Sequence, residues 1–141
     1  MQKEIIEPPT IKKSNALKPF DTIDLPFSQA IKIPQGKQLL FISGQTSVDE
    51  HGNVVGKGDV AVQTRRCLKN IETIVKAAGG DLTNIVSTKV YVRSIDDFYN
   101  SGASKIRREV FKKEFPTSTL VEIKRLADPD FLIEIEAIAA L

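Results

Sequence analysis

The C-terminal segment FLIEIEAIAA, residues 131–140, alternates apolar side chains with a second set that includes two glutamates. A period of two is the pattern of a β-strand that buries one face and leaves the other partly polar. The buried face needs a covering layer, and we expect that layer to be helical. The opposite face mixes charged and apolar side chains, which suggests partial burial by another subunit. The buried face would consist of Phe131, Ile133, Ile135, Ala137 and Ala139, and the mixed face of Leu132, Glu134, Glu136 and Ile138.

Two further segments have apolar residues at spacings of three and four, which predicts helices. The first begins after Asp59, a good N-cap residue, and stops at the glycine pair 79–80. The second is expected to be capped by Asp96 or Asp97. The inward stripes would be Val60, Cys67, Leu68, Ile71, Ile74, Val75 and Ala78 in the first helix, and Ala103, Ile106, Val110 and Phe111 in the second.

Extended segments surround these helices and complete the order ββαβαββ. This order predicts an α+β protein, with two helices on one face of a mixed sheet. In the strand between the helices, Val86, Thr88, Val90 and Val92 should share the inner face. The expected strands are FSQAIKI (27–33), QLLFISG (38–44), NIVSTKVYVR (84–93), STLVEIK (118–124) and residues 131–140.

The N-terminal part is too rich in proline for a regular element, with Pro8, Pro9, Pro19 and Pro26. We expect residues 1–22 to form an extended arm, and we allow for a short strand around Ile23. A chain of 141 residues is long enough to bury one core, so residues 23–141 are expected to form a single domain.

Composition and charge exclude several classes of function. The net charge of +2 is too small to make nucleic acid or an anionic membrane the expected partner, and the absence of tryptophan leaves little surface for base stacking. No apolar run approaches the roughly 20 residues that span a bilayer, and the N-terminal sequence lacks a secretory apolar region. One cysteine, Cys67, and one histidine, His51, rule out an internal disulfide and the usual metal clusters. We therefore expect a cytoplasmic protein without membrane or nucleic-acid partners.

Most of the chain carries four phrases in a specific order: PFSQA (26–30), LLFISGQT (39–46), QTRRCLKNIETIVKAAGGDLTNIVSTKVYVRSIDDF (63–98) and LIEIEAIA (132–139). In this order they resemble the RidA/YjgF family of small trimeric proteins, also labelled endoribonuclease L-PSP. The resemblance implies a chorismate-mutase-like fold and a homotrimer whose sheets line a central barrel, with small-molecule pockets in the clefts between subunits. It also implies a reaction, the hydrolysis of enamines and imines that pyridoxal-phosphate enzymes form from amino acids, without a metal or organic cofactor.

The resemblance also locates the site, and there the chain departs from the family pattern. Active members carry a pocket arginine in a phrase like FPARS, and the phrase FPTST places Ser118 at that position. The partner glutamate, the first in IEIEA, is retained as Glu134, which is the candidate catalytic residue. The other candidate ligand-binding residues are Phe27 in place of a tyrosine, Leu120 in place of a small thiol, and the retained pair Ser43 and Gly44; an asparagine early in the second helix aligns loosely with Gly102.

The missing arginine changes the expected ligand. An arginine fork holds a carboxylate through two charge-assisted hydrogen bonds, which serine cannot replace. Removing one partner of a buried charged pair costs about 2–5 kcal/mol, a factor of roughly thirty to several thousand in affinity or rate. We therefore expect poor hydrolysis of small 2-imino acids, and a pocket that prefers a less anionic ligand or anchors a carboxylate elsewhere.

Three functions stay open, and the sequence does not decide whether the protein is an enzyme. The first is hydrolysis of an enamine or imine through Glu134, and the alternative is a non-catalytic trimer that binds or senses a metabolite. An endoribonuclease or translation inhibitor is disfavoured, because no Lys/His pair forms a recognisable site. Other polar residues have structural interpretations: Cys67 as a buried thiol, His51 as an exposed loop residue, Glu136 and Arg125 as interface or turn residues, and Lys105, Arg107, Arg108, Lys112 and Lys113 as a solvated helix face.

Overall fold

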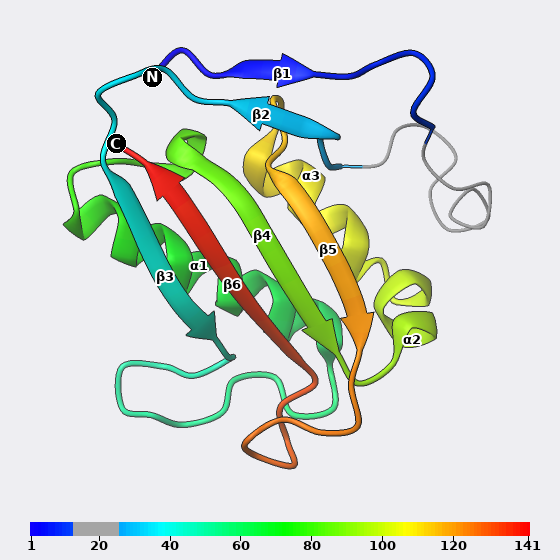
Figure 1. Cartoon of the computed structure of the whole chain (residues 1–141). Helices are drawn as coiled ribbons and strands as arrows, with labels where there is room; N and C mark the ends of the chain where they lie inside the picture. The colour runs from blue at the N-terminus through cyan, green and yellow to red at the C-terminus, as the bar shows by residue number, and fades with distance from the viewer. Residues whose placement is uncertain (13–25) are drawn as a thin grey trace.

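The computed structural model describes residues 1–12 and 26–141 (Figure 1). The strand expected around Ile23 and the domain boundary at residue 22 lie outside the described residues. The elements are β1 (Glu4–Ile6), β2 (Ala30–Lys32), β3 (Leu39–Gln45), α1 (Val60–Ala77), the 3₁₀ turn η2 (Leu82–Asn84), β4 (Ile85–Val92), α2 (Ile95–Asn100), α3 (Ala103–Phe111), β5 (Thr117–Glu122) and β6 (Ile133–Ala140).

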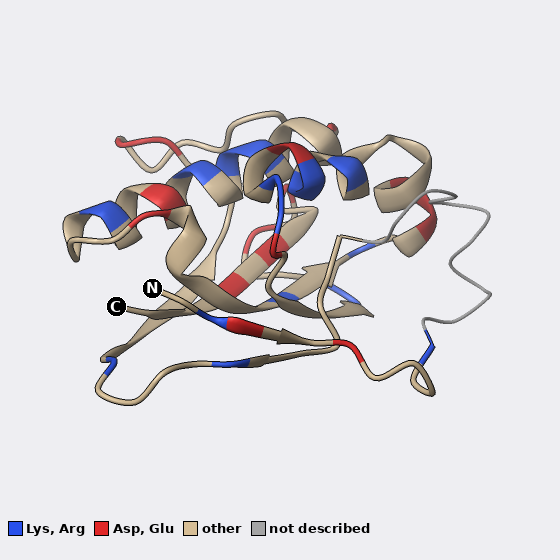
Figure 2. Ribbon diagram, turned by 90° about the horizontal axis from the view of Figure 1, so that it is seen from above, with Lys and Arg blue, Asp and Glu red and all other residues tan. Residues whose placement is uncertain are grey.

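The main sheet has four strands in the order β3-β6-β4-β5. β6 is antiparallel to both of its neighbours, whereas β5 is parallel to β4, and α2 and α3 form the crossover between these parallel strands. The helices of the described residues pack on one face of the sheet, and no helix covers the other face (Figures 1 and 2). The predicted α+β class with a mixed sheet is therefore confirmed.

The alternation in β6 has the predicted outcome from Ile133 onward, whereas the prediction for Phe131 is wrong, because this residue precedes the strand and is only half-buried. Ile133, Ile135, Ala137 and Ala139 are 0–2% exposed and join the apolar stripe of α1 in one core cluster. Cys67 of α1 lies in this cluster with no exposed surface, as predicted. Burial, followed by the charge of the Glu134 carboxylate, raises the pKa of the Cys67 thiol to about 12. The thiol therefore stays protonated and behaves as a small apolar side chain.

Helix α1 begins and ends where the sequence predicts. The Asp59 carboxylate accepts a hydrogen bond from the backbone N–H of Val62 at 3.1 Å. At the other end, Gly79 adopts φ +91°, and the N–H of Gly80 donates to the Val75 carbonyl at 3.0 Å. Within residues 1–12 and 26–141, no helix has the length and apolar character that crossing a bilayer requires.

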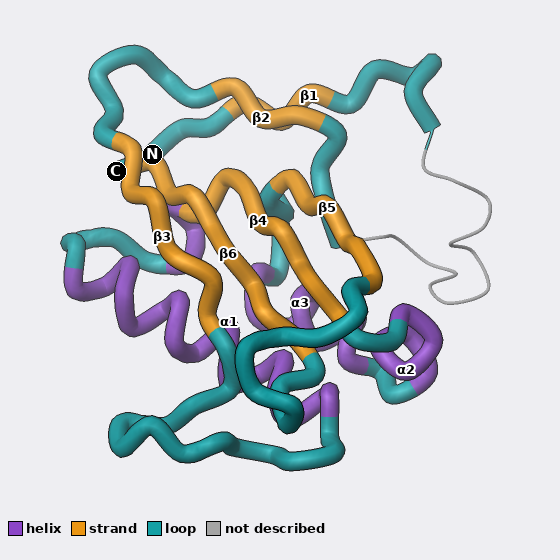
Figure 3. The backbone as a smooth tube through the Cα atoms, turned by 60° about the horizontal axis from the view of Figure 1, so that its bottom comes forward, coloured by secondary structure: helices purple, strands orange, loops and turns teal. Residues whose placement is uncertain are grey.

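The strand predicted at 27–33 is shorter than expected and does not belong to the main sheet. Only Ala30–Lys32 is a strand, and it pairs with β1 in a separate two-stranded sheet beyond one end of the main sheet (Figures 1 and 3). The reason lies at Ser28, whose N–H donates to the Pro116 carbonyl at 3.2 Å and whose hydroxyl donates to the Phe115 carbonyl at 2.5 Å. These bonds hold the chain at Ser28 against the segment that leads into β5. The strand Ala30–Lys32 therefore does not extend back to residue 27.

The second predicted helix is in fact two helices. Gly102 has φ +81°, a left-handed conformation that ends α2 and precedes α3. Ser94, not Asp96 or Asp97, caps α2, since its hydroxyl accepts from the N–H of Asp97 at 3.1 Å. The serine precedes the first helical residue, whereas both aspartates lie within the first turn.

The predicted inner face of β4 is correct from its centre onward but not at its start. Thr88, Val90 and Val92 are buried as expected. A register shift between Ile85 and Ser87 in the pairing with β6 turns Ile85 into the core, while Val86 is only half-buried. A bulge of this kind depends on the partner strand and is not visible in the alternation alone.

Candidate functional site

A hollow of about 410 Å³ lies on the sheet face that no helix covers. Its chemistry comes from carboxylates and one guanidinium beside apolar side chains. Glu134 is the member that the sequence predicts as catalytic. We call this cavity the Glu134 hollow. It is lined by Gly44, Tyr91, Ile123, Arg125, Leu126, Glu134 and Glu136.

Strand register places the two glutamates in this hollow. In β6, the buried Ile133 and Ile135 point to the helices, so Glu134 and Glu136 point away from them. Tyr91 of β4 lies opposite Glu134 in the ladder and donates from its hydroxyl to Glu136 Oε1 at 2.5 Å. This bond, with the charge of Glu136, raises the pKa of Tyr91. Glu136 therefore has a partner inside the hollow.

Glu134 is the carboxylate that stays available. Within the described part of the chain, its carboxylate makes no hydrogen bond or ion pair. Its side chain is half-buried on the sheet. A half-buried carboxylate that is not engaged by a neighbour can exchange a proton with water or with a ligand.

Gly44 makes room for that carboxylate. Gly44 lies in β3 between Ile42 and Gln45, the stretch in which the pairing with β6 is irregular. A Cβ at Gly44 would lie 2.8 Å from Cδ of Glu134 and would overlap Oε1. Gly44 does not have a positive φ, so close approach rather than backbone conformation requires glycine here. The neighbouring Ser43 is exposed on β3 but does not line the hollow.

Arg125 lies in the Glu134 hollow, although a turn or interface role was expected for it. It is exposed, and its Nε donates to the Leu126 carbonyl at 3.2 Å. The hollow thus contains a cation as well as carboxylates, and the sequence does not indicate this, because Arg125 reaches it from the loop after β5.

Ser118 and Leu120 lie on the opposite face of the sheet. In the parallel ladder they pair with Thr88 and Val90, which are buried beneath the helices. Leu120 packs against the core cluster. A single chain therefore does not bring the predicted residues into one pocket, because Glu134 faces away from the helices and Ser118 faces toward them.

Phe27 lies in a third place, in a cavity of about 600 Å³ next to the end of α3. The cavity also contains Ser28, the basic side chains of Arg108, Lys112 and Lys113, and the ring of Phe115. Gly102 has a conformational role between α2 and α3. His51 is exposed in its loop, as predicted.

Beside Ser118 lies a cation that the sequence analysis assigned to a solvated face. Arg107 of α3 is only 5% exposed, so the prediction that it is solvated is wrong. Its Nη1 donates to the Ser118 hydroxyl at 3.2 Å, and its guanidinium lies 5.2 Å from the ring centroid of Phe98. The signal was present in the sequence, since Arg107 lies four residues after the inward Ala103 and four before the inward Phe111.

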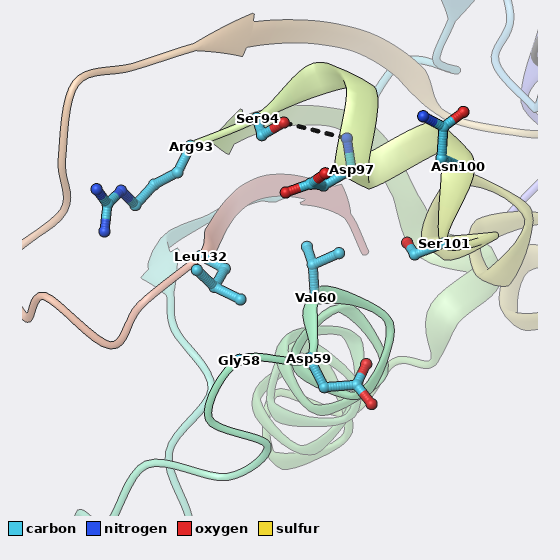
Figure 4. Close-up of a pocket in the computed structure, with 9 residues that line it drawn as sticks. All are labelled: Gly58, Asp59, Val60, Arg93, Ser94, Asp97, Asn100, Ser101 and Leu132. Carbon is cyan, nitrogen blue, oxygen red and sulfur yellow. Dashed lines mark hydrogen bonds between the residues drawn. The ribbon is translucent and has the colours of Figure 1, made fainter.

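Another hollow of about 410 Å³ opens between the first turns of α1 and α2 (Figure 4). Asp59 and Ser94, the two helix caps, lie on its wall together with Arg93, Asp97 and Asn100. None of the predicted site residues lines it. Across the described ranges 1–12 and 26–141, no three His, Cys, Asp or Glu side chains are placed to hold a metal ion.

Comparisons with known proteins cover nearly the whole chain. The sequence model of the family described as endoribonuclease L-PSP matches residues 20–141. A RutC family protein of Pyrococcus horikoshii is 40% identical over 125 residues, which are 89% of this chain and 91% of that protein. The human 2-iminobutanoate/2-iminopropanoate deaminase is 36% identical over 81% of this chain and 79% of its own length.

A solved structure agrees with these sequence matches. The crystal structure of the Rid family protein YyfB from Yersinia pestis has a TM-score of 0.83 with this chain, at 27% identity and over the full length of both chains. Sequence and fold thus lead to the same assignment. The chain belongs to the RidA/YjgF family, also described as endoribonuclease L-PSP.

Proposed function

We propose that this protein hydrolyses an enamine or imine derived from an amino acid, in clefts between the subunits of a homotrimer. The observation that carries the proposal is the Glu134 carboxylate, which is half-buried beside Gly44 and makes no hydrogen bond or ion pair among the described residues. A relative at 36% identity is named 2-iminobutanoate/2-iminopropanoate deaminase, which supports this reaction class.

The reaction needs one group that moves protons. Glu134 accepts a proton from water while the water oxygen forms a bond to the imine carbon, and the C=N double bond becomes a single bond. Glu134 then returns this proton to the nitrogen, which gives a neutral carbinolamine. When the adduct collapses, its hydroxyl proton passes through Glu134 to the nitrogen, the C–N bond breaks, and ammonia leaves as the C=O double bond forms. An enamine first gains a proton on carbon and loses one from nitrogen, which gives the imine. Carbon, nitrogen and oxygen balance with one water consumed, and no electron acceptor is required.

The sheet face that no helix covers is the reason for proposing a trimer. Large apolar side chains are exposed there, with Phe41 72%, Leu39 50% and Val121 39% exposed. An exposed apolar patch on a sheet favours burial against another chain. A neighbouring copy would also bring Ser118 of its edge strand β5 toward the Glu134 hollow, which one chain cannot do. Phe27, Ser118 and Leu120 of one subunit would then complete a cleft with Ser43, Gly44 and Glu134 of the next.

The experiment is hydrolysis of imines generated freshly in solution by an amino-acid oxidase. We expect the protein to release ammonia and keto acid faster than buffer does, while sedimentation gives a mass three times that of the 15.6 kDa chain. If the trimer forms and neither anionic nor neutral imines are hydrolysed faster than in buffer, the proposed function is wrong.

A non-catalytic, metabolite-binding trimer is the second candidate, because Ser118 replaces the arginine of the active pattern. One experiment distinguishes this binding protein from the proposed enzyme. A small molecule would raise the melting temperature of the protein, and no product would form from the corresponding imine.

The substitution Gly44→Ala tests the position of the Glu134 carboxylate. The new methyl group would displace the carboxylate, and a shift of about 1 Å in a reacting group can cost up to about a hundredfold in rate. We expect kcat/KM for imine hydrolysis to fall by about tenfold to a hundredfold. The free energy of unfolding should change by less than about 1 kcal/mol, because the Glu134 side chain can rotate away. Wild-type activity in Gly44→Ala would show that the carboxylate need not lie beside this backbone.

A further inference from the structure

Most of the polar side chains that line the Glu134 hollow offer hydrogen-bond acceptors. Glu134 and Glu136 carry carboxylates, which only accept when they are ionised. The hydroxyl of Tyr91 donates its proton to Glu136 Oε1, so the lone pairs of the Tyr91 oxygen are what remains for a ligand. Arg125 supplies the only donors among these lining side chains, and it is exposed in the loop after β5. A ligand that brings its own N–H groups therefore matches the sheet side of this hollow.

Strand register places the Tyr91 side chain next to Glu134. The two residues are ladder partners in β4 and β6, and side chains at such paired positions share one face with Cβ atoms about 4.5–5.5 Å apart. Lys89, the ladder partner of Glu136, is exposed and does not line the hollow. The neighbour of Glu134 inside the hollow is thus a phenol and not an ammonium group. A group bound to the Tyr91 oxygen would lie within reach of the Glu134 carboxylate.

Glu136 holds the Tyr91 hydroxyl in one orientation. The two oxygens lie 2.5 Å apart, and a hydroxyl that donates to a carboxylate forms one of the stronger hydrogen bonds in proteins. The same bond raises the pKa of Tyr91, so the phenol stays protonated and keeps its hydrogen on the Glu136 side. Both side chains are half-buried on the sheet. The acceptor lone pairs of Tyr91 therefore have a fixed direction before a ligand arrives.

We infer that Tyr91, oriented by Glu136, accepts a hydrogen bond from an N–H group of the substrate and holds the reacting nitrogen beside Glu134. This inference rests on the proposed function and restricts its substrates to imines and enamines that carry hydrogen on nitrogen. A primary imine has one N–H, and a primary enamine and the carbinolamine each have two. An N-methyl imine and an N,N-dimethyl enamine have none. Tyr91 thus determines specificity for the nitrogen, whereas Glu134 moves the protons.

Calorimetry on the full chain tests the inference with two binding probes, methyl 3-aminocrotonate, which is a stable primary enamine, and its N,N-dimethyl derivative. We expect the wild type to bind the primary enamine about fivefold to tenfold more tightly, the effect of one hydrogen bond. Tyr91→Phe removes only the hydroxyl, so it should weaken the primary enamine by the same factor and leave binding of the dimethyl derivative unchanged. Tyr99→Phe is the matched control, since Tyr99 is buried in α2 and does not line the hollow.

Melting temperatures are measured for every variant. If Tyr91→Phe does not fold, Glu136→Leu replaces it, because the hydroxyl is then free to rotate and the difference between the two probes should shrink. Glu136→Gln keeps an acceptor oxygen for the hydroxyl and should retain most of that difference. Equal binding of the two probes by the wild type, no binding of either, or equal losses for both in Tyr91→Phe would overturn the inference.

The inference and the proposed function can fail separately. A wild-type protein that releases ammonia from imines faster than buffer does, but binds both probes equally, refutes the role of Tyr91 and keeps the reaction. A wild-type protein that prefers the primary enamine through Tyr91 but hydrolyses no imine refutes the reaction and keeps the N–H site.

Discussion

Replacing Glu134 with glutamine is expected to lower kcat/KM for imine hydrolysis by about 10²–10⁴-fold, the usual contribution of a general acid or base. The amide has almost the same shape as the carboxylate but cannot accept a proton from water. The fold should persist, because no hydrogen bond or ion pair to this carboxylate occurs among the described residues. The measurement is the initial rate of keto-acid release, together with the melting temperature of both proteins.

Glu136→Gln provides the comparison, since this carboxylate lies in the same hollow but already accepts from Tyr91. We expect a much smaller loss of activity. The pKa of Tyr91 should fall toward its ordinary value, because the hydrogen bond to Glu136 is the main cause that raises it. Absorbance of the ionised phenol follows that titration. If Glu134→Gln keeps wild-type activity, or if both variants lose activity equally, Glu134 is not the group that moves the proton.

The sequence predicts which side of β6 faces the helices, and with it the location of Glu134. A period of two is a local property, so Ile133 and Ile135 identify the buried face without knowledge of the neighbours. The position of Gly44 against Glu134 is different, because it depends on an irregular pairing between two strands that are distant in the chain. The family resemblance selects both residues but does not give the reason for the glycine.

The charges around the site are harder to predict from the sequence. Arg107 belongs to a run of basic residues, and such a run usually marks a solvated face. Its spacing from Ala103 and Phe111 indicates burial instead, and the structure shows that spacing to be the better guide. No periodic pattern places Arg125 in the Glu134 hollow, since a loop delivers it. Helix and strand periods thus predict faces, whereas contacts across loops and between faces require the three-dimensional structure.

The largest loss of stability is expected from a buried amide that the sequence analysis did not single out. Gln63 of α1 has no exposed surface. Its Nε2 donates to the carbonyls of Gly56 at 3.1 Å and Asp130 at 2.9 Å, and its Oε1 accepts from the N–H of Leu132 at 2.9 Å. One side chain therefore joins the loop before α1 to the loop before β6.

Gln63→Leu keeps the volume but leaves these three backbone groups without their partner. An unsatisfied buried group costs about 1–3 kcal/mol, and some of these groups will regain water at the loops. We expect the free energy of unfolding to fall by about 3–5 kcal/mol and the melting temperature by about 10–20 °C. Urea denaturation of the wild type and the variant measures the difference. Gln38→Leu is the matched control, because Gln38 is exposed and its change should stay within about 0.5 kcal/mol. If both variants unfold at the same urea concentration, the three hydrogen bonds of Gln63 do not hold the two loops, and the apolar contacts of α1 and β6 must do so alone.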